Sequence, residues 1–251
     1  MFHPIFQRLA QKFMILATLG CLVIGWTTIS EAGIALTTPA GLNPGDQFQF
    51  VFLTHDSTNA INSDITYYNN FVNSDAAGAT YSGMTVTWLA IVSTATVNAI
   101  SQTGDANIPV YTVDGMEVAS STTTAPGGLW SGSLLNYIRL SIDGSQNVAP
   151  VWTGTNAQGT QDGPYYLGNT TTTSPNGPIA TQGRAGNTDS SWITFGVVNE
   201  PTRVPAYFYG ISTVLTVPSS VPEPSTILPM AMGMTTLLLQ RGLRRWKSHR
   251  G

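Results

Sequence analysis

The pattern of hydrophobic positions predicts the first strand of the chain most clearly. Within Gln47–Leu53, three phenylalanines at Phe48, Phe50 and Phe52 alternate with other side chains. This period of two is typical of a strand with one buried face. A longer alternation of the same kind covers Ala206–Val217. We expect these first and last strands to pair, which would bring both ends of the domain together.

A period near 3.6 follows the first strand and predicts one amphipathic helix over residues 59–77. The helix has Ser57, Thr58 or Asn59 as a candidate N-cap and Gly78 as a terminator. Its apolar positions recur at i, i+4, i+7 and i+11, namely Ile61, Ile65, Tyr68 and Val72.

Shorter apolar segments predict further strands, separated by clusters of Gly, Asn, Asp and Pro that supply turns. These strands are expected at Met84–Ser93, Val110–Val113, Tyr137–Ile142 and Trp192–Val198. Together the elements predict an α+β fold, a strand-rich single domain over residues 46–217 with one main helix. An all-β sandwich is the alternative. Residues 33–45 are expected to form an N-terminal linker.

The first 32 residues have the organisation of a secretory signal peptide. Arg8 and Lys12 precede an uncharged apolar stretch over 13–26, and small residues follow as far as Ala35. Cleavage after Ala32 and cleavage after Ala35 both fit the pattern of small residues. The chain is therefore expected to be exported.

The opposite end of the chain combines three features in a fixed order. The motif Pro222-Glu223-Pro224 comes first, an apolar run over 226–240 follows, and basic residues end the chain at Arg241, Arg244, Arg245, Lys247 and Arg250. At about 1.5 Å per residue the apolar run makes a helix of roughly 22 Å, which is short against a hydrocarbon core of about 30 Å. The prolines keep Glu223 on an extended stretch. The basic residues orient the terminus toward the cytoplasm.

This end resembles the PEP-CTERM sorting signal of Gram-negative bacteria. The resemblance implies that Pro222, Glu223 and Pro224 are recognised, and the tail removed, by a membrane-embedded exosortase. Residues 218–251 would then form the sorting signal, just as residues 1–32 form the signal peptide. An ordinary stop-transfer helix that stays in the membrane is the alternative.

Setting both ends aside changes the charge of the chain. The whole sequence has a formal net charge of −3, whereas Gly33–Val221 has three arginines, no lysine and eleven acidic residues, a net charge of about −8. Such an acidic surface repels phosphates, which argues against nucleic-acid binding. The same stretch has no cysteine, which excludes disulfides and thiol chemistry there.

Candidate catalytic and metal-binding residues are few. His55 is the single histidine of the exported stretch, and no Gly-x-Ser-x-Gly pattern accompanies it. We interpret His55-Asp56 as a loop cap after the first strand. The segment Asp143-Gly144-Ser145-Gln146-Asn147 alternates oxygen-bearing side chains as calcium loops do, but a hairpin turn is the favoured interpretation. We expect no catalytic site and no cofactor, with calcium as the one ion to consider.

Exposed aromatic side chains would offer a surface for polysaccharide, because sugar rings pack on flat aromatic faces. Trp88 and Trp192 are flanked by apolar residues, so we expect them in the core. Trp130 and Trp152 are bordered by glycine and small polar residues. We expect these two to be exposed and available for ligand stacking.

Two threonine-rich tracts, 120–125 and 169–174, are expected to be surface loops. Asn169-Thr170-Thr171 has the form of an N-glycosylation sequon. An unmodified loop is the simpler interpretation of both tracts.

The middle of the chain carries a second resemblance. Its pieces are, in order, Thr87–Ala99, Val110–Ala119, Leu129–Ser133, Val151–Thr155, Gly159-Thr160 and Ser191-Trp192. This order is similar to that of exported bacterial proteins related to the endostatin and C-type-lectin-like fold. The resemblance covers residues 46–217 and implies an α+β domain whose terminal strands pair. Disulfides common in that fold, and a calcium-and-sugar triplet, are missing from the sequence, so sugar binding does not follow from it.

The sequence as a whole predicts an exported, non-catalytic protein of the cell surface or extracellular matrix. Its role would be structural or adhesive, with polysaccharide contact as one form of it. Expected partners are signal peptidase, an exosortase, the membrane during transit and exopolysaccharide, but not nucleic acid. The alternatives are a secreted acidic hydrolase, which needs two close Asp carboxylates, and a calcium-dependent carbohydrate-binding module, which needs Asp143 and Asn147 clustered with loop carbonyls.

Overall fold

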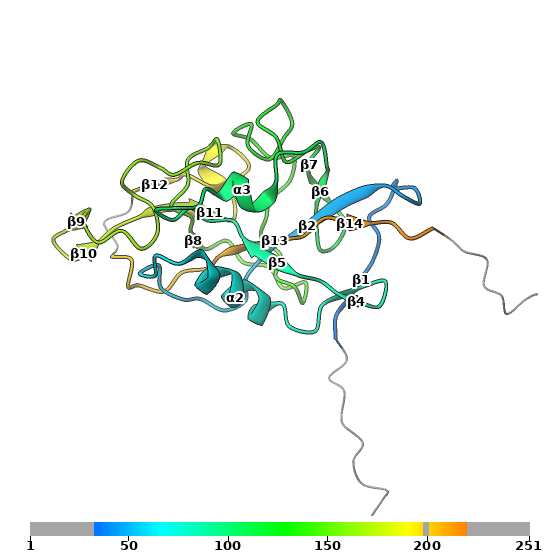
Figure 1. Ribbon diagram of the computed structural model, residues 1–251, viewed down its shortest axis with the longest axis horizontal. Coiled ribbons are helices and arrows are strands. Elements are labelled where there is room, and N and C mark those ends of the chain that lie inside the picture. The colour runs from blue at the N-terminus through cyan, green and yellow to red at the C-terminus, as the bar shows by residue number, and fades with distance from the viewer. Residues whose placement is uncertain (1–32, 198–200, 220–251) are drawn as a thin grey trace, which may run out of the picture.

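The main sheet of the protein has its first strand at its centre. A computed structural model describes residues 33–197 and 201–219 (Figure 1). Within them the strand order of this six-stranded sheet is β5-β13-β2-β6-β7, and β14 also pairs with β2. The strands are β2 (Gln47–Leu53), β5 (Trp88–Ala90), β6 (Val110–Thr112), β7 (Glu117–Ala119), β13 (Tyr209–Ser212) and β14 (Leu215–Thr216).

β2 has the predicted bounds, but it is buried on both faces rather than on one. Phe48, Phe50 and Phe52 belong to one hydrophobic cluster, whereas Val51 and Leu53 belong to a second. All five side chains are fully buried. The expectation of a half-buried strand was wrong. The alternating phenylalanines indicated one buried face, but Val51 and Leu53 bury the opposite face as well. Strands covered on both sides read as continuous rather than alternating apolar runs.

The expected pairing of the first and last strands is confirmed. β13 runs antiparallel to the end of β2, with Tyr209 opposite Leu53. β14 runs antiparallel to the start of β2, with Leu215 opposite Phe48. Both ends of the domain therefore meet on one central strand.

A β-bulge divides the last strand, which was predicted to be continuous over 206–217. Between β13 and β14 this strand gains one residue relative to β2. Ser212 compensates for the interruption, because its hydroxyl accepts the backbone N–H of Phe50 at 2.9 Å. The side-chain amide of Gln49 donates to the carbonyl oxygen of Ser212 at 2.7 Å. The N–H of Phe50 and the carbonyl oxygen of Ser212 are thus partnered, whereas the buried side-chain oxygen of Gln49 has no hydrogen-bond partner among the described residues.

The main helix, α2, spans Ile65–Asp75 and is shorter than the predicted helix over 59–77. Asp64, rather than a residue at 57–59, is the N-cap, and its carboxylate accepts a first-turn backbone N–H at 2.9 Å. The helix begins late because Thr58 is already bridged to Ala206. Its predicted apolar face is confirmed at Tyr68 and Val72, which are fully buried.

The remaining elements are short. A second sheet has the order β12-β11-β8, and α3 and the 3-10 helix η1 are the other helical segments of the described residues. Their bounds are β1 (Ala35–Leu36), β3 (Thr80–Tyr81), β4 (Met84–Thr85), α3 (Ala99–Thr103), β8 (Pro150–Trp152), β9 (Thr173–Ser174), β10 (Gly177–Pro178), β11 (Thr181–Arg184), η1 (Ser190–Trp192) and β12 (Gly196–Val197). Strands outnumber helices, as a strand-rich domain requires.

The other predicted strands are confirmed in part. β6 fills most of the strand expected at 110–113, and the segment 84–93 divides into β4 and β5. The strand expected at 192–198 is replaced by the end of η1 and the two-residue β12, and Val198 lies outside the described residues. The strand expected at 137–142 is wrong, since Leu140 makes one isolated bridge to Gln146 there.

The predicted linker over 33–45 contains part of the folded domain. Ala35 and Leu36 form β1 and pair in parallel with Thr80 and Tyr81 of β3. Leu36 is buried in the first hydrophobic cluster. The expectation of a linker was wrong for these residues, because a two-residue strand is too short to produce a recognisable period.

α2 also closes one edge of the main sheet. β5 is the edge strand, and two asparagines of α2 bond to its outward backbone groups. The side-chain oxygen of Asn69 accepts the N–H of Ala90 at 2.8 Å. The side-chain oxygen of Asn73 accepts the N–H of Trp88 at 2.9 Å, and the side-chain amide of Asn73 donates to the carbonyl oxygen of Trp88 at 2.5 Å. Unpaired edge groups invite pairing with other chains. These asparagines therefore protect the edge.

We expect Asn73→Ala to lower the free energy of unfolding by about 2 kcal/mol, because it removes partners from both backbone groups of Trp88. Asn69→Ala should cost about 1 kcal/mol, since it removes one such partner. Asn70→Ala is the matched control, because Asn70 is exposed on the same helix. Chemical denaturation followed by circular dichroism measures all three. Equal losses for Asn70→Ala and Asn73→Ala would contradict the edge role.

Candidate functional site

The residues that sequence analysis assigned to sorting lie outside the described part of the chain. These are Pro222, Glu223 and Pro224 of the motif and Arg241, Arg244 and Arg245 of the basic cluster. Within the described residues, no helix combines the length and the apolar character needed to cross a bilayer.

Trp130 is buried rather than exposed, so its expected role in ligand stacking is wrong. Its indole N–H donates to the hydroxyl of Thr103 at 3.0 Å, and its ring lies 5.8 Å from that of Trp192. A Cβ atom at Gly159 would come within 2.6 Å of the Trp130 ring. Gly159, which is distant from Trp130 in sequence, therefore lets the backbone pack closely against this ring.

Trp152 is also fully buried, which corrects the second stacking candidate. It lies in β8, and its indole N–H donates to the carbonyl oxygen of Val204 at 3.0 Å. The neighbouring Gly154 has a φ of +60°, and a Cβ there would come within 2.7 Å of two backbone atoms. The glycine after Trp152 serves a tight backbone approach. A sugar ring has no access to either tryptophan in this fold.

Asn169, the first residue of the sequon, is 5% exposed. Its side-chain amide donates to the carbonyl oxygen of Pro164 and to the hydroxyl of Thr172. A glycosylated amide could not keep both contacts in a buried position. The folded domain therefore does not present Asn169 for modification.

The segment after Ile142 forms the expected hairpin turn. The N–H of Gly144 donates to the carbonyl oxygen of Ser141 at 2.9 Å. The carboxylate of Asp143 accepts the backbone N–H and the hydroxyl of Ser145 at 2.9 and 2.7 Å. These bonds, with the hydroxyl contributing most, lower the pKa of Asp143. Among the described residues, no group of three or more His, Cys, Asp or Glu side chains is placed to hold a metal ion.

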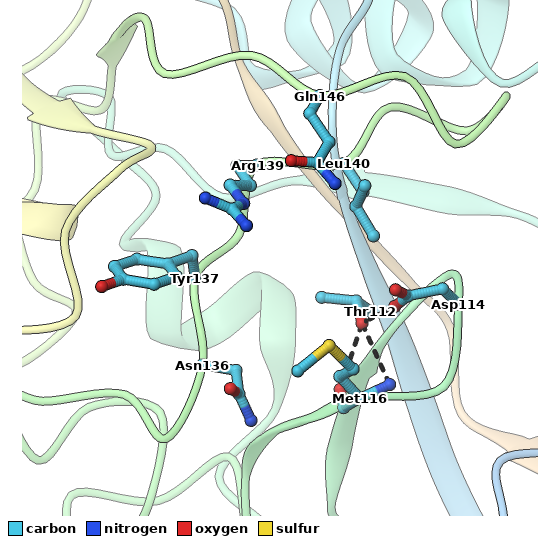
Figure 2. Close-up of a pocket in the computed structure, with 8 residues that line it drawn as sticks. All are labelled: Thr112, Asp114, Met116, Asn136, Tyr137, Arg139, Leu140 and Gln146. Carbon is cyan, nitrogen blue, oxygen red and sulfur yellow. Dashed lines mark hydrogen bonds between the residues drawn. The ribbon is translucent and has the colours of Figure 1, made fainter.

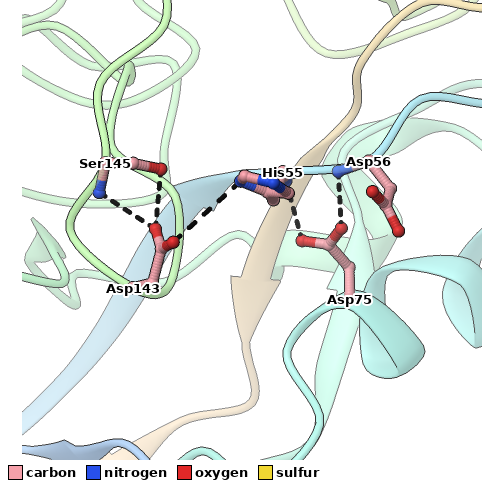
Figure 3. A network of polar contacts seen from close by, with 5 residues as sticks. All are labelled: His55, Asp56, Asp75, Asp143 and Ser145. Carbon is pink, nitrogen blue, oxygen red and sulfur yellow. Dashed lines mark hydrogen bonds and ion pairs between the residues drawn. The ribbon is translucent and has the colours of Figure 1, made fainter.

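His55 lies in a polar network at the end of β2, and a backbone cap rather than a base fits its position (Figure 3). Its Nδ1 lies 4.0 Å from a carboxylate oxygen of Asp143, and the two side chains are 65% and 50% exposed. Asp75 accepts the backbone N–H groups of His55 and Asp56, each at 2.9 Å. In the described part of the chain, no hydroxyl is hydrogen-bonded to the His55 ring, so no nucleophile accompanies it.

Asp56 and Asp75 are two acidic residues that the fold brings near each other, and Asp75 has a structural role. Both oxygens of Asp75 already accept backbone N–H groups. Burial raises the pKa of Asp75, the charge of Asp56 adds to that effect, and the two hydrogen bonds oppose it. Asp75 therefore holds the loop after β2.

A small recess lies beside the β6–β7 hairpin (Figure 2). Its volume is about 60 Å³. The guanidinium carbon of Arg139 lies 5.2 Å from the ring centroid of Tyr137. The recess is lined by Thr112, Asp114 and Met116 from the hairpin and by Asn136, Tyr137, Arg139, Leu140 and Gln146 from the segment beside it.

Backbone and side-chain hydrogen bonds hold this recess in shape. The amide of Asn136 donates to the carbonyl oxygen of Glu117 in β7 at 2.8 Å. The carbonyl oxygen of Leu140 accepts the N–H of Leu53 at 2.8 Å. The recess was not predicted, because residues 137–142 were expected to form a strand. The useful signal was the rarity of cations, since Arg139 is one of three arginines in Gly33–Val221, which has no lysine.

No protein-family model matches the chain, and no curated protein matches it significantly. Function must therefore be inferred from the residues and contacts of the chain itself.

We expect the stabilising effect of Asp143 to depend on pH. Its folded-state pKa is lowered, so its contribution is present above the unfolded pKa of about 3.9 and is lost as pH falls through the folded value. Asp143→Asn should therefore lower the melting temperature at pH 7 but not near pH 2. Asp105→Asn, at an exposed acidic residue, corrects for the loss of one negative charge. A pH-independent difference between Asp143→Asn and the wild type would oppose this assignment.

Proposed function

We propose that the protein is exported and sorted to the cell surface or extracellular matrix, where it has a non-catalytic, structural or adhesive role. The observation that carries this proposal is the order of Pro222-Glu223-Pro224, apolar run and basic cluster at the end of the chain. An exosortase would recognise the motif, the apolar helix would hold the chain in the membrane, and the basic residues would set its orientation.

The end of the folded domain supports this arrangement. The N–H of Val217 donates to the carbonyl oxygen of Asp46, and the N–H of Gly45 donates to that of Val217, both at 2.9 Å. Pro222 follows Val217 by five residues, a span of at most about 18 Å when extended. A protease acting at the motif would work close to a folded domain, which suits sorting of an already folded protein.

The position of β14 indicates how the domain would be oriented relative to the membrane. β14 and the β9–β10 hairpin lie at opposite ends of the long axis of the described domain (Figure 1). If the chain is held at the membrane beyond β14, the β9–β10 hairpin faces outward. A long domain held by one end suits a surface protein that contacts extracellular material.

A C-type-lectin-like fold is our proposal for the finer architecture. Two features support it, namely the pairing of β2 with β13 and β14, and the helix that follows β2 along the chain. The two alternatives, a secreted acidic hydrolase and a calcium-dependent carbohydrate-binding module, have less support. Asp114 is the one carboxylate that lines the described recess, and Asp143 is engaged in its own turn.

We expect the wild-type chain to lose its tail in a host that carries an exosortase, whereas Glu223→Ala should retain it. The readouts are the mass of the mature protein and its distribution between membrane and surface fractions. Glu200→Ala is the matched control, because it removes an acidic residue outside the motif. An intact tail in the wild type and in Glu223→Ala would mean that the segment is a permanent anchor.

We expect signal peptidase to cleave after Ala32, leaving Gly33 as the first residue. Cleavage after Ala35 would remove the carbonyl group of Ile34, which accepts the N–H of Thr80 at 2.9 Å, and half of β1. Amino-terminal sequencing of the exported protein distinguishes the two sites. A mature chain beginning at Leu36 would contradict a role for β1 in the exported fold.

A further inference from the structure

Two of the three arginines in the described domain lie over exposed aromatic rings. Arg139 lies 5.2 Å from the ring centroid of Tyr137, and Arg184 lies 4.4 Å from that of Phe195. The two rings are 43% and 48% exposed. In the described part of the chain the one ion pair joins His55 and Asp143, so neither arginine pairs with a carboxylate. Among the described residues, neither guanidinium group therefore has a carboxylate partner, although acidic residues are in excess.

The two arginine–aromatic pairs lie on neighbouring segments. The N–H of Asn147 donates to the carbonyl oxygen of Arg139 at 2.9 Å, and the N–H of Ala185, next to Arg184, donates to that of Ala149 at 3.2 Å. Val148 lies between these contacts and is 65% exposed. We call the surface formed by Tyr137, Arg139, Val148, Arg184 and Phe195 the arginine–aromatic strip.

The size of the recess beside Arg139 limits what can enter it. Its volume of about 60 Å³ is several times the ~10–15 Å³ that one ordered water molecule requires. A carboxylate group fits this space. A ring carrying the carboxylate would lie outside the recess, against the exposed face of Tyr137.

The charges around the recess select among anions. Arg139 lines one side and Asp114 lies on the opposite side, with the amides of Asn136 and Gln146 at the wall (Figure 2). A guanidinium group binds a carboxylate through paired hydrogen bonds, and the Asp114 carboxylate accepts from hydroxyl groups. Asp114 repels every anion, and it repels a doubly charged phosphate group more strongly than a singly charged carboxylate. The recess therefore matches a group that carries one carboxylate with hydroxyls beside it.

We propose that the arginine–aromatic strip binds an acidic polysaccharide built from uronic acids. One uronate would place its carboxylate at Arg139 and its ring on Tyr137, while another would use Arg184 and Phe195. This inference specifies which class of polysaccharide the proposed surface protein contacts, so it rests on the proposed function. Binding by the purified protein does not depend on sorting, so the two proposals fail separately.

The test is binding of full-length protein in detergent micelles to polygalacturonate, measured by isothermal titration calorimetry. Arg139→Gln and Arg184→Gln should each weaken binding about tenfold, the loss expected for a charge-assisted hydrogen bond. Arg203→Gln is the matched control. It changes the charge equally, but Arg203 is not a residue of the strip, and it donates to the carbonyl oxygen of Asn176 in the turn between β9 and β10. Its affinity should stay within about twofold.

Dextran and dextran sulfate are the comparison ligands. We expect no binding to dextran and at least tenfold weaker binding to dextran sulfate. Equal binding of polygalacturonate and dextran sulfate, equal effects of Arg203→Gln and Arg139→Gln, or no binding by the wild type would each overturn the proposal. Thermal melts check that the variants fold. If Arg139→Gln does not fold, Arg139→Lys replaces it, because lysine keeps the charge but loses the paired geometry.

Discussion

Burial of β2 on both faces constrains every other part of this fold. A strand without access to water must pair its backbone N–H and C=O groups along both edges. β13 and β14 supply those partners on one side and β6 supplies them on the other. The chain must therefore bring its last strand back to its first before the two hydrophobic clusters can form.

The side chains of β2 pack closely against the neighbouring strands β13 and β5. Gly210 of β13 is needed because a Cβ there would lie 2.2 Å from the ring of Phe52. That ring packs edge-on against Trp88 of β5, with centroids 4.7 Å apart. Because Gly33–Val221 has no cysteine, such apolar contacts carry the stability that disulfides provide in other proteins.

Both edges of the main sheet are covered by groups from nearby segments. At β5 the cover comes from the side chains of Asn69 and Asn73. At β7 the carbonyl oxygen of Val118 accepts the N–H of Leu135 at 2.9 Å, and Asn136 bonds to Glu117. The segment that covers β7 continues directly into Tyr137 and Arg139. Protection of the sheet and formation of the recess thus depend on the same few residues.

The sequence was sufficient for long elements and insufficient for short ones. The alternation in 47–53 and the spacing of Tyr68 and Val72 come from the side chains themselves, so β2 and the core of α2 were predictable. β8, β11 and β1 have two to four residues, and their pairing is determined by distant segments. Trp88 and Trp192 lie in the core as expected, whereas Trp130 and Trp152 were misjudged, because a flanking glycine signals small size without revealing what packs against it. The segments that carry Arg139 and Arg184 come together only through their separate contacts with residues 147–149.

The pairing of β14 with β2 has a mechanical consequence. A surface protein anchored beyond Val217 and attached elsewhere to a polymer carries tension between those two points. Interstrand hydrogen bonds lie perpendicular to antiparallel strands. A pull along the last strand would therefore load its bonds to β2 together, in shear, rather than breaking them one at a time. The strand that closes the fold would also be the one that bears the load.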